Sequence, residues 1–225
     1  MIRVASYNIR KAVGLDWRRD PMRVAHAIAR LGADIVALQE ADKRLGPRPS
    51  ALPPEALHAT GMIALSVDDG PSLGVHGNAI LVREGLGVDG AHGIDLPGFE
   101  PRGALFAEIG TPMGPLLFCA THLGLARKSR QSQLHRIVRE IGDRRGRAVI
   151  AGDMNEWSRV SGFAPLDGFD LLCPGRSFHA ARPVACLDRI ALGSDWACDR
   201  TGVFRDASAL RASDHLPVWA EIRPA

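Results

Sequence analysis

The chain alternates short apolar runs with polar segments rich in glycine or proline. Apolar or alternating runs of about four to eight residues, bounded by turn residues, are typical of short buried strands. On this basis the sequence predicts strands over residues 2–8, 34–40, 62–67, 77–82, 104–109, 116–122, 148–153, 187–192 and 216–222.

Two segments have the apolar spacing of helices instead. The first follows Asp20 and Pro21, a typical N-cap residue and a residue favoured at the first helical position, and ends at Gly32. The second covers residues 129–144, with an apolar face made by Leu134, Ile137, Val138 and Ile141. Between the predicted strands, residues 45–55 (LGPRPSALPPE) are expected to form a proline-rich loop.

Several predicted strands end at polar side chains that can take part in catalysis. In VIAGDMNE (149–156), Asp153 and Asn155 follow the apolar run two positions apart. Both would face one spot if the strand continues that far, because alternate residues of a strand share a side. A turn or a helix N-cap, which both residue types favour, is the alternative. The residues at or just after strand ends are Asn8, Glu40, His122, Asp153 and Asn155, and Asp188 in CLDRI with Asp214 and His215 in SDH complete the candidate set.

This set combines oxygen ligands with two imidazoles. Carboxylate and amide oxygens suit Mg²⁺, Mn²⁺ or Ca²⁺ rather than a soft metal. A phosphoester resists hydrolysis because the attacking water meets an anionic phosphorus, and a bound cation neutralises that charge. A general base must also activate the water, and donors must hold the phosphoryl oxygens. The set contains a side chain for each task, and ligand sites of α/β proteins lie at the carboxyl ends of strands. The pattern therefore favours a metal-dependent phosphoesterase.

Seven short motifs carry a family resemblance. YNIR, LQE, GNAIL, ATHLG, GDMNE, LDRI and SDHLPV, in this order, resemble the endonuclease/exonuclease/phosphatase superfamily over residues 2–221. That superfamily includes DNase I, exonuclease III, sphingomyelinases and inositol polyphosphate phosphatases. The resemblance implies an α/β (α+β) fold in four layers, with two mixed β-sheets flanked by helices and a site at one end. It also implies Mg²⁺, with Mn²⁺ as a substitute.

The resemblance also implies a role for each side chain. Glu40 would bind the metal, with Asn8 and Asp214 close to it. Asp153 would orient or deprotonate the water, and Asn155 would hold a phosphate oxygen. The remaining assignments are His215, paired with Asp188, on the scissile phosphate; His122 as proton donor to the leaving oxygen; and Asn78 and Arg102 as residues lining the substrate pocket.

The substrate stays open at this point. A nuclease is the leading hypothesis, and a phospholipid or inositol-phosphate phosphoesterase is the second. Arg10 stands where abasic-site endonucleases carry an acid, and no tyrosine follows Tyr7, so abasic-site repair is disfavoured. The basic stretch 125–147 either meets phosphates or forms the solvated face of a helix.

Composition agrees with a globular enzyme. The chain has 225 residues, of which 46% are hydrophobic, and we expect one domain over residues 1–225. Its net charge of +3 permits contact with a polyanion without requiring it. No run of about 18 apolar residues predicts a transmembrane segment, and residues 1–10 predict a strand rather than a signal peptide. A cytoplasmic location is therefore expected, with the four cysteines, which form no C-x-x-C pair, as reduced thiols.

Three alternatives compete with the metal-dependent phosphoesterase. GLGVDG (85–90) matches a dinucleotide-binding fingerprint, but no helical pattern follows it. GPSLG (70–74) matches a nucleophile elbow around Ser72, and the order Ser72, Asp188 or Asp214, His215 fits a metal-free serine hydrolase. The strand-turn-helix context of such an elbow is missing. The third alternative is a catalytically silent binding module on the same fold.

Overall fold

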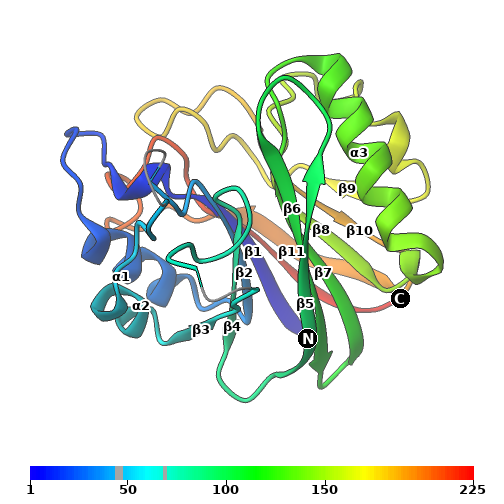
Figure 1. The fold of residues 1–225 in the computed structure, drawn as a ribbon, viewed down its shortest axis with the longest axis horizontal. Helices are drawn as coiled ribbons and strands as arrows, with labels where there is room; N and C mark the ends of the chain where they lie inside the picture. Colours follow the sequence, from blue (N-terminus) through cyan, green and yellow to red (C-terminus); the bar gives the residue numbers. More distant parts are fainter. Residues whose placement is uncertain (44–47, 68–69) are drawn as a thin grey trace.

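Two six-stranded sheets lie face to face in the computed structural model, which describes residues 1–43, 48–67 and 70–225 (Figure 1). The first sheet has the order β11 (Trp196–Val203), β12 (Val218–Pro224), β1 (Ile2–Asn8), β2 (Ile35–Gln39), β4 (Ala79–Arg83) and β3 (Met62–Ala64). The second has the order β5 (Gly87–Leu96), β6 (Arg102–Thr111), β7 (Gly114–His122), β8 (Ala148–Asp153), β10 (Asp188–Leu192) and β9 (Asp170–Leu172).

Helices cover the outer face of each sheet. α1 (Pro21–Leu31) and α2 (Pro54–Thr60) lie against the first sheet, and α3 (Arg127–Ile141) lies against the second (Figure 1). Single 3₁₀ turns occur at Arg10–Ala12, Gly142–Arg145 and Ala164–Leu166. The result is a helix–sheet–sheet–helix sandwich, which confirms the four-layer α/β fold expected from the sequence.

Apolar side chains fill the three spaces between these four layers. Val4, Phe118 and Ile190 belong to the cluster between the two sheets. Ile28 and Leu38 pack between α1 and the first sheet, and Leu134 of α3 packs with Phe106 of the second sheet. Strands with apolar residues on both faces are the ones covered on both sides, which is why their sequences are nearly continuous apolar runs.

Strand pairing brings the polar strand ends together. β1 and β2 are parallel, as are β7 and β8, so the carboxyl ends of each pair lie at the same edge. In the second sheet His122 is opposite Asp153, and the antiparallel β10 places Asp188 opposite Asp153 from the other side. Asn8 ends β1 of the facing sheet. One end of the sandwich therefore collects residues from both sheets.

Most predicted elements form, with shifted bounds. Each of the nine predicted runs contains a strand, although β3 stops at Ala64. α1 begins as expected, with the Asp20 side chain accepting from the Arg23 N–H at 3.0 Å, and ends at Gly32 with φ 61°. The second helix covers Arg127–Ile141 rather than 129–144. The proline-rich loop is wrong at its carboxyl end, where α2 begins at Pro54, and residues 45–47 of it lie outside the described part.

Four elements have no counterpart among the predicted ones. They are α2, β5, β9 and β11. β5 is largely exposed, β11 is mostly only partly buried, and both are rich in charged or small residues, so they lack the apolar signal of a buried strand. β5 also contains most of the GLGVDG motif, and a strand rather than a helix follows its glycines, so the dinucleotide site is not formed.

The cysteine prediction is wrong for one pair. Cys173 and Cys186 are joined in a disulfide, whereas Cys119 and Cys198 are free. Cys173 follows β9 and Cys186 precedes β10, and these two strands pair in an antiparallel manner. This pairing brings together two cysteines whose sequence spacing matches no motif. No helix within the described ranges is long and apolar enough to cross a membrane.

Candidate active site

Asp153, the last residue of β8, lies at the centre of the polar strand ends and is 2% exposed. Its Oδ2 atom faces Asn8 Nδ2 at 3.0 Å, His122 Nε2 at 3.4 Å and His215 Nε2 at 3.6 Å. Its Oδ1 atom accepts the backbone N–H of Asn155 at 3.0 Å. A buried carboxylate is costly unless it is paired, and these contacts supply the pairing for Asp153.

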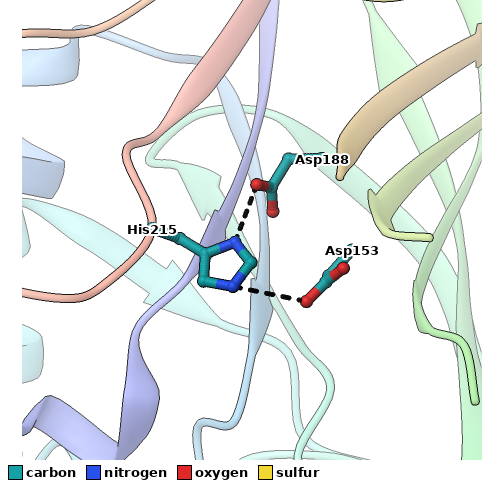
Figure 2. Close-up of side chains that lie close together, drawn as sticks. All are labelled: Asp153, Asp188 and His215. Atoms are coloured by element: carbon teal, nitrogen blue, oxygen red, sulfur yellow. Dashed lines mark hydrogen bonds and ion pairs between the residues drawn. The ribbon is translucent and has the colours of Figure 1, made fainter. Parts of the chain in front are cut away.

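His215 lies between two carboxylates (Figure 2). Its Nδ1 is 2.8 Å from Asp188 Oδ2, and its Nε2 points to Asp153. Burial alone would lower the pKa of His215, but Asp188, Asp153 and Asp214 outweigh burial and raise it to about 9. The ring is therefore an imidazolium at neutral pH, and both of its nitrogens donate.

Two residues of the segment before β10 fix this histidine and its partner. The Ser177 hydroxyl donates to the same Asp188 oxygen at 2.5 Å. The Phe178 ring lies with its centroid 4.8 Å from that of His215. The Oδ1 atom of Asp188 is buried and has no hydrogen-bond partner. Asp188 therefore orients His215, and its second oxygen remains available as an acceptor.

His122 has the opposite protonation state. Burial lowers the pKa of His122 to about 3, since Asp153 raises it less than burial and the nearby Arg102, His215 and Lys11 lower it. One carboxylate thus has a charged imidazole on one side and a neutral imidazole on the other. Groups whose environments separate their pKa values in this way are candidates for different catalytic roles. A neutral His122 cannot give up a proton as an imidazolium does, so its expected role as proton donor stays a prediction.

Asn155 does not continue the strand. β8 ends at Asp153, and Asn155 has φ 50°, in the left-handed region. Its backbone N–H bonds to the Asp153 side chain, as in an Asx-turn, and its side-chain Nδ2 donates to the Leu123 carbonyl at 2.8 Å. The turn alternative therefore describes the backbone, and Asp153 and Asn155 are adjacent through this turn rather than through strand alternation.

The three expected metal ligands lie around the turn that follows β1. Asn8 Oδ1 accepts the Arg10 N–H at 3.1 Å, and Arg10 Nε lies 3.4 Å from Asp214 Oδ2. Glu40 follows β2 with φ 52°, and its carboxylate forms an ion pair with Lys11. Lys11 was not a sequence candidate, although it comes directly after the YNIR motif.

The chemistry of this donor set fits a hard divalent cation. Glu40 and Asp214 offer carboxylate oxygens and Asn8 an amide oxygen, the ligand types that Mg²⁺ and Mn²⁺ prefer. The Lys11 ammonium shows that the Glu40 carboxylate already attracts a positive charge in this fold. Within the described residues, the carboxylates and imidazoles that come close enough to share one cation are those of Asp153, Asp188 and His215, whose ligand atoms lie within 4.8 Å of one another. In this structure the three side chains contact one another through the two nitrogens of the His215 ring.

A pocket adjoins the cluster. It has a volume of about 310 Å³, and its walls include Glu40, His122 and Arg102. Arg102 therefore lies where a substrate-binding residue was expected, and its Nη2 donates to Glu100 at 2.6 Å. Asn78 does not line this pocket; its Nδ2 donates to the carbonyls of Val75 and Gly103 at 3.1 and 3.0 Å, which ties two loops together.

Ser72 lies in a loop that is followed by β4, without the helix of a nucleophile elbow. Its hydroxyl donates to Asp42 at 2.5 Å and to the Gly74 carbonyl at 2.9 Å, and neither partner is an imidazole. His215 is bonded to Asp188 instead. The three members expected for a serine hydrolase triad are therefore not assembled.

Comparisons with known proteins agree with this geometry. The model of the Endonuclease/Exonuclease/phosphatase family matches residues 5–215. The uncharacterized protein YbhP of Escherichia coli (strain K12) is 34% identical over 168 residues, which cover 66% of this chain and 63% of that protein. The chain thus spans somewhat less than two thirds of the length of this relative.

Two solved structures share the fold at low sequence identity. The mannosyl-6-phosphatase Bt3783 of Bacteroides thetaiotaomicron VPI-5482 has a TM-score of 0.73 and 20% identity, with 99% of each chain covered. The D. rerio protein TDP2, complexed with a single strand DNA product, has a TM-score of 0.72 and 17% identity, with 99% of this chain and 98% of that chain covered. With a family model matched from residue 5 to residue 215, the chain belongs to the Endonuclease/Exonuclease/phosphatase family.

Proposed function

We propose that this chain is a divalent-metal-dependent phosphoesterase that hydrolyses phosphodiester bonds. The observation that carries the proposal is the buried Asp153 carboxylate, one oxygen of which faces Asn8, His122 and His215 together. The two histidines beside this acid have pKa values shifted in opposite directions, the arrangement expected of groups with acid and base roles.

The protein side chains divide the work as follows. Asp153 accepts a hydrogen bond from the attacking water, orients it and takes its proton. His215 donates from Nε2 to a phosphoryl oxygen, where its charge stabilises the negative charge that develops in the transition state. Asp188 is a positioning residue, because it holds Nδ1 of His215 at 2.8 Å. The Asn155 side chain is held by the Leu123 carbonyl beside this group, where it would contact the phosphate.

Glu40, with Asn8 and Asp214, would hold Mg²⁺ or Mn²⁺. The bound cation would neutralise phosphoryl charge and lower the pKa of water. Lys11 supplies positive charge at the same carboxylate in this structure. Support for the proposal comes from the donor chemistry and from the family, and metal dependence is the property to measure first.

A nuclease is the leading specificity, and a phospholipid or inositol-phosphate phosphoesterase is the second. The TDP2 neighbour was solved with single strand DNA and the Bt3783 neighbour is a phosphatase, so the fold accommodates both polymeric and small substrates. The basic stretch 125–147 gives nucleic acid little support. Arg144 and Arg147 are paired with Glu108, and Arg136 is paired with Glu140.

A cytoplasmic location remains a prediction from the sequence. The Cys173–Cys186 disulfide is an observation against it, because stable disulfides are rare in reducing compartments. Fractionation of the native cells would decide between the two.

The specificity test compares supercoiled plasmid with bis-p-nitrophenyl phosphate, each with Mg²⁺, Mn²⁺ or EDTA. Plasmid nicking that EDTA abolishes would establish a metal-dependent nuclease. Turnover of the small diester with intact plasmid would move the assignment to a lipid or small-molecule phosphoesterase. No hydrolysis of any phosphodiester or phosphomonoester would refute the proposed function and favour a binding module.

A further inference from the structure

The pocket beside Asp153 has several basic side chains in its wall. We call it the Arg48 pocket and define it by the lining residues Lys11, Lys43, Arg48, His76, Arg102 and His122. Its volume of about 310 Å³ lies at the lower end of the range for small-molecule sites, about 300–1,000 Å³. His122 and Glu40 belong both to this pocket and to the candidate active site, so the two are continuous.

Three carboxylates also line the pocket, and each has donors of its own. Glu40 is paired with Lys11, and Glu100 is paired with Arg102 at 2.6 Å. Asp42 is 6% exposed and accepts from the Ser72 hydroxyl and from the Leu73 N–H at 3.2 Å. The acidic side chains therefore do not cancel the charge on the wall that carries Lys43 and Arg48.

Lys43 and Arg48 form a cationic wall. Within the described part of the chain, no carboxylate lies within ion-pair distance of either side chain. The Lys43 N–H donates to the Pro49 carbonyl at 2.9 Å, so the two basic residues flank the same backbone contact. Both are partly buried, so a ligand at this wall would meet two charges that water screens less than at an open surface.

A histidine orients the Arg48 guanidinium. Arg48 Nη1 lies 3.3 Å from His76 Nδ1, and His76 Nε2 lies 2.7 Å from Asp95 Oδ1. Because a guanidinium only donates, His76 must accept at Nδ1 and donate from Nε2 to Asp95. This relay holds one edge of Arg48, and within the described ranges its other N–H groups make no hydrogen bond, so they can reach a ligand. A fixed guanidinium matches the oxygens of a phosphate.

We propose that the Arg48 pocket binds a second anionic group of the substrate, a terminal phosphate, while the scissile ester lies at Asp153. The inference rests on the proposed phosphoesterase function and names its substrate class: compact phosphodiesters that carry a phosphomonoester at one end. A terminal phosphate has close to two negative charges at neutral pH, which matches Lys43 and Arg48 better than the single charge of an internal diester.

The test uses two chromogenic diesters that differ in one group. They are thymidine 5′-(p-nitrophenyl phosphate) and the same compound with a 3′-phosphate, assayed with Mg²⁺ and with Mn²⁺. We expect kcat/KM to be roughly tenfold or more higher for the 3′-phosphorylated probe, since a charged hydrogen bond is worth at least this factor. The preference should appear mainly in KM, because the second phosphate lies away from the reacting bond.

Arg48→Ala should bring the ratio of the two kcat/KM values close to one. Arg48→Lys keeps the positive charge but loses the paired N–H donors of the guanidinium, so it should give an intermediate ratio. Arg83→Ala is the matched control, because Arg83 is exposed and ends β4, whereas the pocket adjoins Gly77, just before the start of that strand. It should keep the wild-type ratio. If Arg48→Ala fails to fold by circular dichroism, Lys43→Ala and Arg48→Lys carry the test.

Two outcomes distinguish a failure of the second-phosphate site from a failure of the proposed phosphoesterase function. Turnover of both probes with a ratio near one in the wild type, or an unchanged ratio in Arg48→Ala, would overturn the second-phosphate site alone. No turnover of either probe or of bis-p-nitrophenyl phosphate with either cation would instead overturn the proposed function, and the inference with it.

Discussion

At the scale of single residues, the site depends on how one carboxylate distributes its two oxygens. Oδ1 of Asp153 is used by the turn that positions Asn155, and Oδ2 faces the amide of Asn8 and both imidazoles. An amide in place of this carboxylate would keep the shape and remove the charge. Replacing Asp153 by asparagine therefore tests its role in catalysis with little change to the shape of the folded site.

Asp153→Asn should lower kcat on bis-p-nitrophenyl phosphate by roughly 10²-fold or more, the scale expected for loss of a general base. Asp89→Asn, an exposed position on β5, is the matched control and should keep the wild-type rate. Initial rates and a thermal unfolding curve for each protein make the comparison. Wild-type turnover by folded Asp153→Asn would contradict the assigned role.

Asp188→Asn tests orientation rather than proton transfer. The amide that this substitution introduces could present a donor to His215 Nδ1, which would favour the wrong tautomer and remove the charge that stabilises the imidazolium. We expect kcat to fall by roughly 10²-fold or more while KM changes little, and the alkaline limb of the pH–rate profile to move to lower pH. An unchanged pH profile would show that Asp188 does not set the state of His215.

At the scale of elements, ion pairs connect the start of α3 to the segment that follows β8. Glu156 is 2% exposed, and its carboxylate accepts from Arg130 at 2.7 Å and from Arg127 at 3.1 and 3.2 Å. Arg130 is itself buried, so this residue does not lie on the solvated helix face that was one of the two interpretations of the basic stretch. The pair connects α3 to the segment that carries Asn155.

Glu156→Gln should lower the free energy of unfolding by about 3–5 kcal/mol at pH 7, because it leaves a buried guanidinium without its charge partner. Burial raises the pKa of Glu156, but Arg130, Ser158 and Arg127 outweigh it and lower the pKa from 4.5 to about 2. The stabilisation is therefore complete above pH 4.5 and is lost as the pH falls toward 2.

Urea unfolding of the wild type and of Glu156→Gln at pH 7 and pH 3 measures this effect, with the exposed Glu84→Gln as control. The difference between wild type and Glu156→Gln should be smaller at pH 3. A difference that is equal at both pH values would mean that the ion pair does not carry the stability.

The segment between β9 and β10 carries Ser177 and Phe178 and is closed by the Cys173–Cys186 disulfide. Thiol titration in denaturant should detect two free thiols, Cys119 and Cys198, before reduction and all four cysteines after it. Detection of all four without reductant would restore the original prediction of reduced thiols.

At the scale of the whole molecule, apolar patterning was sufficient to predict the buried strands and the two longer helices. Strand ends then identified Asp153 and His122, and the segments CLDRI and SDH added Asp188 and His215; the fold does bring these four together. Pattern could not reveal β5 and β11, because strands that are exposed or only partly buried have no continuous apolar run. It also could not reveal Ser177 or the Arg48 wall, because these depend on loops whose approach is set by tertiary contacts.

The role of Glu40 illustrates the same limit. Its place after a strand indicated an oxygen ligand, and the structure places it on the pocket wall in an ion pair with Lys11. The backbone turns at three consecutive residues with left-handed conformation, Arg10, Lys11 and Ala12, and this turn brings Lys11 to Glu40. The hydrophobic pattern of the sequence does not predict such a turn, so it could not predict the ion pair.

Metal dependence is the property on which the proposed chemistry depends most directly. Hydrolysis of bis-p-nitrophenyl phosphate by the wild type should be absent in EDTA and should return when Mg²⁺ or Mn²⁺ is titrated back. Glu40→Gln should then require roughly tenfold or more cation for half-maximal rate. Full activity in EDTA would contradict a metal-dependent phosphoesterase.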